Sequence, residues 1–83
     1  SWLAVERIQK ADENGNVIQG NVVAVDSKDC TIQGDNKLLA LIGLEHLIVV
    51  DTKDATLICS KAQAGNIKKA IELLKKGARD EYL

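Results

Sequence analysis

Apolar and polar positions repeat in a pattern along residues 21–59. The ten residues from Val23 to Ile32 recur 25 positions later as the ten from Ile48 to Leu57, with Val, Asp, Lys, Asp and Thr unchanged. Each copy has an apolar run, a polar corner and a second apolar run. Because β-branched side chains pack well on a pleated surface, the apolar runs predict strands. Two copies of strand, corner and strand predict either stacked β-coils or paired hairpins.

The polar corners of the two copies have the same chemistry. They span Asp26 to Asp29 and Asp51 to Asp54, with Ser27 or Thr52 in second place. Asp, Ser and Thr side chains favour turns because they bond nearby backbone groups. Paired carboxylates can also serve acid–base catalysis, but a reaction needs such a pair once. We therefore interpret these four Asp residues as corner-formers.

Turn signals and apolar runs outside the repeat predict further elements. Asn14-Gly15 predicts a tight turn with positive φ at both central residues, followed by a strand near Val17-Ile18. The continuous apolar run 38–42 predicts a strand covered on both faces. Three glycines are predicted to mark bends: Gly20, Gly34 and Gly43.

Helical spacing of apolar residues appears at both ends of the chain. Trp2, Val5 and Ile8 predict a short N-terminal helix, in which Trp2 is either core filling or a plug into a larger body. The second set predicts a C-terminal α-helix: Ile67, Ala70, Ile71 and Leu74. Ser60 and Gln63 have the spacing of a capping box at its start. Gly77 is placed to end it in the left-handed conformation.

Composition limits the chain to one small domain or part of one. It has 83 residues, of which 46% are hydrophobic, yet it contains no Phe or Met and only 2% aromatics. The core must therefore be built from Val, Ile, Leu and Ala. Small-molecule sites usually recruit aromatic side chains, so their scarcity counts against a ligand pocket. Because the chain starts at Ser1, we expect it to be part of a longer protein.

The net charge of −1 is unevenly distributed. Residues 1–59 carry five Lys/Arg against nine Asp/Glu, whereas residues 60–83 carry six against three. With one Arg and one Tyr, the basic segment lacks the aromatic and Arg content of base readers, so we predict a solvated helix face and no nucleic-acid partner. The sequence has neither a signal peptide nor an apolar run near ~20 residues. We therefore expect a cytoplasmic protein without a membrane partner.

Candidate reactive side chains are few. Cys30 and Cys59 form no CxxC and are predicted to be free, buried thiols, with a disulfide as the alternative. His46 is the only histidine and has only Glu45 nearby, so we predict an exposed or partner-facing side chain instead of a metal ligand. Residues 12–16 resemble a calcium loop but lack its spaced ligands. No catalytic, cofactor-binding or metal-binding residue is predicted.

Four longer segments resemble one protein family. They are DENGN at 12–16, GNVVAVDSKDC at 20–30, IGLEHLIVVDTKDA at 42–55 and IKKAIELLKKG at 67–77. Together they resemble the C-terminal region of bacterial mannose-1-phosphate guanylyltransferase, also called GDP-mannose pyrophosphorylase. The resemblance covers nearly the whole chain. His46 departs from the family pattern, in which Asp is usual at this place.

The resemblance implies a mainly β domain: a short left-handed β-helix-like coil with a short N-terminal helix and a C-terminal α-helix. Because the chain lacks a regular hexapeptide pattern, a small β-sandwich is the alternative. Residues 1–11 would be the tail of a preceding catalytic domain or a linker helix, 12–59 the β-helix-like domain, and 60–83 the C-terminal helix and tail. Family enzymes join GTP and mannose 1-phosphate with Mg²⁺, but the motifs that do so have no counterpart here. The chain itself is therefore expected to hold no cofactor.

Three hypotheses about function follow. The first is a non-catalytic domain that braces the N-terminal catalytic domain of the same protein and helps to hold a homodimer. Its possible interface residues are Trp2, Leu44, His46 and Leu47. The second is an independent sugar- or nucleotide-binding module. The third is a structural oligomerisation unit that pairs through exposed strand edges.

Overall fold

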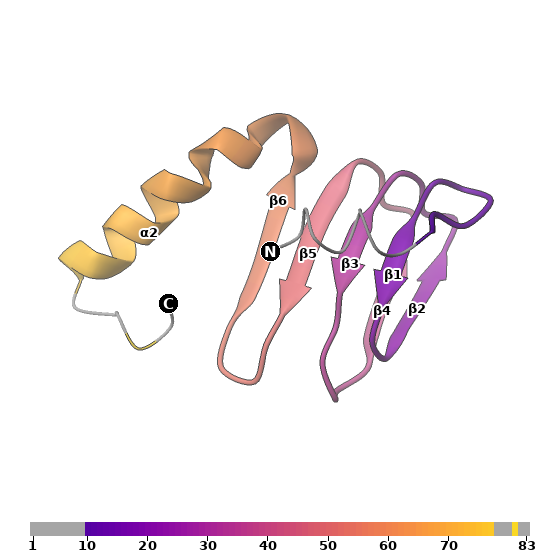
Figure 1. Cartoon of the computed structure of the whole chain (residues 1–83), viewed down its shortest axis with the longest axis horizontal. Helices are drawn as coiled ribbons and strands as arrows, with labels where there is room; N and C mark the ends of the chain where they lie inside the picture. The colour runs from indigo at the N-terminus through magenta and orange to yellow at the C-terminus, as the bar shows by residue number, and fades with distance from the viewer. Residues whose placement is uncertain (1–9, 78–80, 82–83) are drawn as a thin grey trace.

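The structure is a computed structural model that describes residues 10–77 and 81. The predicted N-terminal helix, with Trp2, therefore lies outside the described residues. The described elements are six strands, a 3₁₀ helix and an α-helix (Figure 1): β1 (Val17–Gln19), β2 (Val22–Val25), β3 (Thr31–Gln33), β4 (Leu39–Ile42), β5 (Leu47–Asp51), β6 (Thr56–Ser60), η1 (Lys61–Asn66) and α2 (Ile67–Lys76). Neither described helix is both long and apolar enough to cross a membrane.

The strands form two sheets between which the chain passes back and forth. The four-stranded sheet has the order β1-β3-β5-β6, and the two-stranded sheet contains β2 and β4. Pairing is parallel between β1, β3 and β5 and between β2 and β4, and only β6 runs antiparallel to its neighbour. The first two turns of the chain, β1 to β2 and β3 to β4, thus each add one strand to each sheet. This parallel stacking confirms the mainly β coil with a C-terminal helix, in place of the sandwich; its left-handedness stays a prediction.

The register of the coil contradicts the predicted duplication. Val17 lies beside Thr31, 14 positions further along the chain, whereas Val22 lies beside Leu39 and Thr31 beside Ile48, each 17 positions further along. The repeated phrase has an offset of 25. Its first copy places β2 and β3 in different sheets, whereas its second copy forms the antiparallel pair β5 and β6. The prediction that both copies fold alike is therefore wrong.

The two corners differ because their backbones differ. At the first corner, Asp26 and Asp29 adopt positive φ values of 49° and 50°, which turns the chain toward the other sheet. At the second corner, the Thr52 N–H donates to the Ala55 carbonyl at 2.9 Å, and the Thr52 hydroxyl donates to the same oxygen at 3.0 Å. That turn closes a hairpin within one sheet. Similar turn-forming side chains are compatible with both geometries.

The core lies between the two sheets and is aliphatic, as predicted. Its buried members are Cys30, Ile32, Leu41 and Val49, with Ile32 fully inaccessible. Partly buried apolar residues pack around them: Ile18, Val22, Leu39 and Leu47. Both cysteines are free as predicted, but only Cys30 is buried. Cys59 is half-buried, which corrects the prediction for that residue.

Strand β4 is covered on one face only, contrary to the prediction. Leu41 is buried against the core, whereas Ile42 is 70% exposed and Ala40 is also exposed. The reason is that the second sheet has an inner and an outer face, and no described element packs on the outer one. A continuous apolar run therefore does not by itself establish two-sided burial.

Both ends of the C-terminal helix differ from the prediction. Residues 61–66 form the 3₁₀ helix η1, and the Ser60 side chain makes no capping bond with a described residue. Gln63 instead accepts a hydrogen bond from the side chain of Asn66, which competes with a capping box. Gly77 ends α2 with φ −84°, outside the left-handed region. Its N–H still donates to the Leu73 carbonyl at 3.0 Å, so the helical bonding pattern continues to this residue.

The turn before β1 is simpler than the predicted one. Gly15 has a positive φ of 77°, but Asn14 is not among the described residues with positive φ. The Gly15 N–H donates to the Asp12 carbonyl at 3.0 Å, which closes a four-residue turn. The strand that follows joins a parallel sheet, so no hairpin forms here and the primed-turn prediction is wrong.

Candidate docking surface

Asn16 holds the first corner of the coil together. It is 2% exposed, its side-chain amide donates to the Ser27 carbonyl at 2.8 Å, and its side-chain oxygen accepts from the Cys30 N–H at 3.0 Å. Its own N–H donates to the Asp12 carboxylate at 2.9 Å. These bonds satisfy backbone groups that the coil would otherwise bury without partners. Sequence reasoning missed Asn16; its only signal was its place between a turn and a strand.

His46 belongs to an ion-pair cluster that joins three successive segments. Its Nδ1 lies 2.7 Å from Asp29 Oδ2, and the Lys61 ammonium donates to Asp29 Oδ1 at 2.9 Å. The side chain of His46 is 64% exposed, which confirms the predicted exposure. The backbone of His46 has a φ of 57°, so the residue also forms a corner. This arrangement explains His46 by folding and assigns it no chemical step.

Three aspartates should make the fold sensitive to acid. The hydrogen bond from His46 lowers the pKa of Asp29, with Lys61 adding to it. A hydrogen bond from the backbone N–H of Asn16 lowers the pKa of Asp12, and a hydrogen bond from the side-chain hydroxyl of Thr56 lowers the pKa of Asp51. These pKa values are lower in the folded protein than in the unfolded chain, where the value is 3.8. The ionised carboxylates therefore stabilise the fold above the unfolded pKa, and this stabilisation is lost as the pH falls through the folded pKa values. We expect the urea midpoint to fall steadily below about pH 4.

Urea unfolding of Asp29→Asn as a function of pH tests this dependence. The variant should lose part of the wild-type acid sensitivity, because one depressed carboxylate has been removed. Asp54→Asn, at an exposed corner position, is the matched control and should keep the wild-type profile. A wild-type midpoint that rises as pH is lowered through this range would contradict the assignment.

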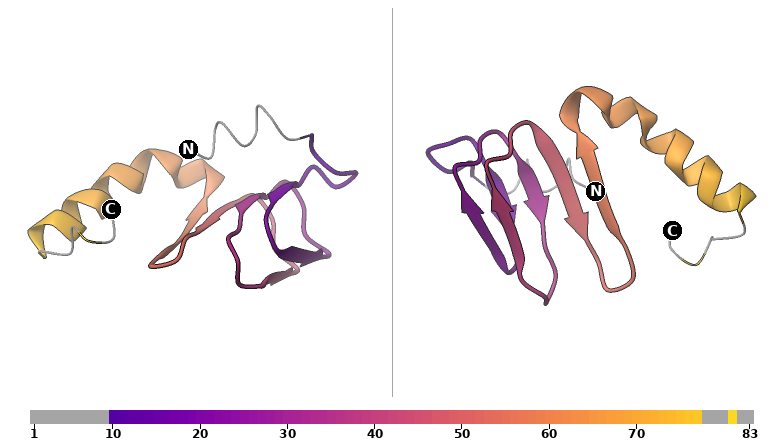
Figure 2. Two further views of the ribbon diagram at one scale, coloured as in Figure 1. Left: turned by 60° about the horizontal axis from the view of Figure 1, so that its bottom comes forward. Right: turned by 180° about the vertical axis from the view of Figure 1, so that it is seen from behind.

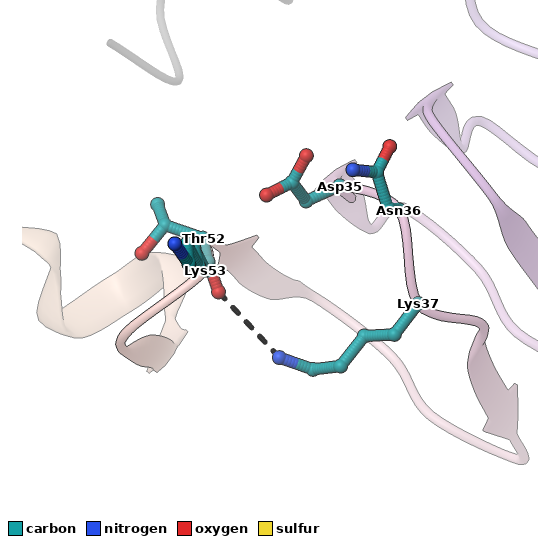
Figure 3. A pocket seen from close by; sticks show the side chains of 5 residues that line it. All are labelled: Asp35, Asn36, Lys37, Thr52 and Lys53. Atoms are coloured by element: carbon teal, nitrogen blue, oxygen red, sulfur yellow. Dashed lines mark hydrogen bonds between the residues drawn. The ribbon is translucent and has the colours of Figure 1, made fainter.

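A polar hollow lies where the β3–β4 and β5–β6 connections meet (Figure 3). Its lining residues are Asp35, Asn36, Lys37, Thr52 and Lys53. The Lys37 ammonium reaches across it to the Thr52 carbonyl at 3.5 Å and pairs with the buried Asp51 carboxylate at 3.2 Å. The hollow contains no aromatic side chain, and the Thr52 hydroxyl is occupied by Ala55. This is a braced corner, not an arrangement suited to covalent chemistry.

The family resemblance implies Mg²⁺ for the longer enzyme, and the described acidic side chains are the groups that could hold it. Within residues 10–77 and 81, no three His, Cys, Asp or Glu side chains come together as a metal site. Asp29 and His46 are used by each other and by Lys61. The described residues therefore do not fit the ion, and we derive no step through it.

A group of exposed apolar side chains lies on the outward side of the two-stranded sheet. Val23 lies beside Ala40, and Val25 lies beside Ile42 in the parallel register. We call these residues, with the adjacent Leu38, the outer face: Val23 (50% exposed), Val25 (46%), Leu38 (58%), Ala40 (exposed) and Ile42 (70%). The outer face carries no charge, and uncharged apolar patches of this kind mark contact surfaces. It is the candidate docking surface.

The predicted interface residues are separated by the fold. Leu44 (37% exposed) and His46 lie at the corner after β4, where a partner could reach them. Leu47 packs against the core and is half-buried, so it offers little surface. Trp2 lies outside the described residues. The sequence signal for the outer face was the apolar run that contains β2, which was interpreted only as strand chemistry.

Comparison with known proteins gives consistent results. The family model described as the MannoseP isomerase/GMP-like beta-helix domain matches residues 20–74. A mannose-1-phosphate guanylyltransferase from Klebsiella pneumoniae is 43% identical over 99% of this chain, and one from Escherichia coli is 42% identical over 99%. The alginate biosynthesis protein AlgA of Pseudomonas putida is 40% identical over 96%.

A solved structure has the same fold. It is described as mannose-1-phosphate geranyltransferase from Thermus thermophilus, and it matches 89% of this chain with a TM-score of 0.75 and 29% identity. The chain covers 23% of that structure. It likewise spans only 17% of the Klebsiella and Escherichia coli relatives and 16% of the Pseudomonas one.

Proposed function

This chain belongs to the MannoseP isomerase/GMP-like beta-helix domain family, and from that membership we propose that it is the non-catalytic accessory domain of a longer nucleotidyltransferase. The longer protein joins GTP and mannose 1-phosphate into GDP-mannose and pyrophosphate. The observation that carries the proposal is the match to guanylyltransferases over 99% of this chain but 17% of theirs. A domain of that share leaves most of each relative for the catalytic machinery.

The structure favours a role in domain docking over a role in catalysis. Two acidic side chains at the corners are used in folding: Asp29 by His46 and Lys61, and Asp51 by Thr56 and Lys37. In contrast, the outer face is apolar and uncovered by any described element. Burying such a face against the catalytic domain would stabilise both by roughly 25 cal/mol per Å² removed from water. Docking is therefore the property that the geometry favours.

The remaining parts of the proposal follow from the same role. We assign the Mg²⁺ of the reaction to the catalytic domain, since no described cluster here fits it. The longer protein acts in the cytoplasm, where GTP is available, and the accessory domain helps to hold a homodimer. The alternative of a sugar- or nucleotide-binding module has less support. The polar hollow is the place that it would use, and that hollow has no aromatic stacking surface.

Assays with the 83-residue chain and with the full-length protein test the proposed function. Supplied with GTP, mannose 1-phosphate and Mg²⁺, the full-length protein should form GDP-mannose and the chain alone should form none. Any turnover by the chain alone would refute the non-catalytic role. Lack of GDP-mannose formation by the full-length protein would refute the proposed parent activity.

Variants of the outer face test docking separately. In the full-length protein, Val25→Ser with Ile42→Ser should lower the thermal midpoint of the catalytic domain and weaken the dimer in sedimentation. Asp54→Asn is the control, because this exposed corner residue lies outside the outer face. Unchanged midpoint and sedimentation for the double variant would contradict docking through this face.

A further inference from the structure

Strand β4 has one paired edge and one open edge. Leu39 donates its N–H to the Asn21 carbonyl at 3.0 Å, and Gly43 donates to the Val25 carbonyl at 2.9 Å. Backbone groups in a strand alternate in direction, so Leu39, Leu41 and Gly43 bond to β2. The N–H and C=O groups of Ala40 and Ile42 therefore point to the opposite edge. No described strand pairs there, because the two-stranded sheet ends at β4.

The four-stranded sheet continues beyond this edge. Its strands β5 and β6 extend past β4 with no described strand of the second sheet facing them (Figures 1 and 2). Ile58 on β6 lies beside Val49 in the ladder and so points to the same, inner side. Val49 is 5% exposed, but Ile58 is 67% exposed. The third turn of the coil thus contributes β5 to the four-stranded sheet, but the corresponding place in the two-stranded sheet, beside β4, is open.

A second copy of the chain paired symmetrically through its own β4 edge does not fit this place. Two β4 edges could pair antiparallel only about a twofold axis perpendicular to the sheet, which keeps the inner faces on the same side. The β5 and β6 strands of the copy would then project into the layer that already contains β5 and β6 (Figure 1). An occupant narrower than a whole domain avoids this overlap.

The chemistry of the edge specifies an extended polypeptide. Alternating backbone donors and acceptors are satisfied by another strand, whereas the backbone groups of a helix bond within the helix. Charged residues and Pro usually keep the edge of a sheet unpaired, and the run 38–42 contains neither. The strand that fits would place apolar side chains toward Ile58 on one face and beside Ile42 on the other, and so would be apolar throughout.

We propose that the open edge of β4 binds an extended, uncharged segment from the part of the longer polypeptide outside these 83 residues. The segment adds a third strand to the two-stranded sheet and covers Ile58. This inference rests on the proposed function only in that the chain is part of a longer protein. It adds a specific mode of attachment, strand addition, to the surface contact of the outer face.

Residue-resolved hydrogen exchange in the full-length protein tests the proposal directly. Leu39 and Leu41 serve as internal references, because their N–H groups bond to β2 whatever occupies the edge. We expect the amides of Ala40 and Ile42 to exchange at least about 100-fold more slowly than free peptide, close to the references. Exchange of Ala40 and Ile42 within about 10-fold of free peptide, with Leu39 and Leu41 protected, would overturn strand addition.

A proline variant separates strand addition from other coverings. Ala40→Pro removes a donor at the open edge but no bond to β2, so Leu41 should stay protected while Ile42 exchanges about 10-fold faster or more. Ala40→Val keeps the donor and should behave as wild type. Protection of Ile42 that survives Ala40→Pro, or that depends on protein concentration, would point to a different covering or to a second copy and contradict the proposal. These readouts do not depend on GDP-mannose formation, so failure of the proposed activity is distinguishable.

Discussion

Replacing Gly20 with Ala should lower the free energy of unfolding by about 3 kcal/mol. Gly20 has a φ of 96°, a conformation that side-chain-bearing residues rarely adopt. A Cβ at this position would also lie 2.7 Å from the backbone carbonyl of Gly34. The bends at Gly20 and Gly34 stack closely because the Gly34 N–H donates to the Gln19 carbonyl at 2.7 Å.

Gly43→Ala is the matched control that separates backbone strain from the clash of an added Cβ with the backbone of Gly34. Gly43 also has a positive φ, 67°, but no described atom comes within 4 Å of an added Cβ. Only backbone strain acts there, and we expect a loss of about 1 kcal/mol. Urea unfolding of the chain, followed by far-ultraviolet circular dichroism, measures both variants. Equal losses at the two positions would contradict the close stacking of the bends.

Ile32→Ala should also lower the free energy of unfolding by about 3 kcal/mol. Ile32 is completely buried and lies between Ile18 and Val49 in the parallel ladder, so no neighbour can easily fill the space. The loss combines the transfer of the deleted atoms with the cavity that they leave.

Ile42→Ala is the control for Ile32→Ala in the 83-residue chain. Both are strand isoleucines, but Ile42 is 70% exposed, so its truncation should change the free energy of unfolding by less than about 0.5 kcal/mol. Urea unfolding again measures the difference. A larger loss of unfolding free energy for Ile42→Ala than for Ile32→Ala would contradict the placement of the core between the two sheets.

Strand chemistry was predictable because it is local. The β-branched runs that contain Val22–Val25 and Leu47–Asp51 became β2 and β5, and the aliphatic core followed from composition. Register was not predictable in this way. It depends on which turn of the coil stacks on which, and Asp-Ser-Lys-Asp and Asp-Thr-Lys-Asp are each compatible with an arch or a hairpin. Positive φ at Asp26 and Asp29 decided between them.

The candidate docking surface was only partly predictable. His46 was expected to be exposed or partner-facing and is exposed, and Leu44, a predicted interface residue, is exposed as well. The outer face was missed because continuous apolar sequence at 38–42 does not reveal how many faces are covered. The role of Asn16 was missed for a related reason: its partners, Ser27 and Cys30, come from the next turn of the coil. Contacts between turns are set by packing, which local pattern does not encode.

The stacking of the turns is the claim on which the core, the outer face and the open edge all depend. Through-space proton contacts measured by nuclear magnetic resonance test it most directly. The structure predicts backbone contacts between Ile32 and Val49 and between Ala24 and Leu41, one turn apart. Contacts between Val23 and Ile48, as the 25-residue repeat would require, would contradict it.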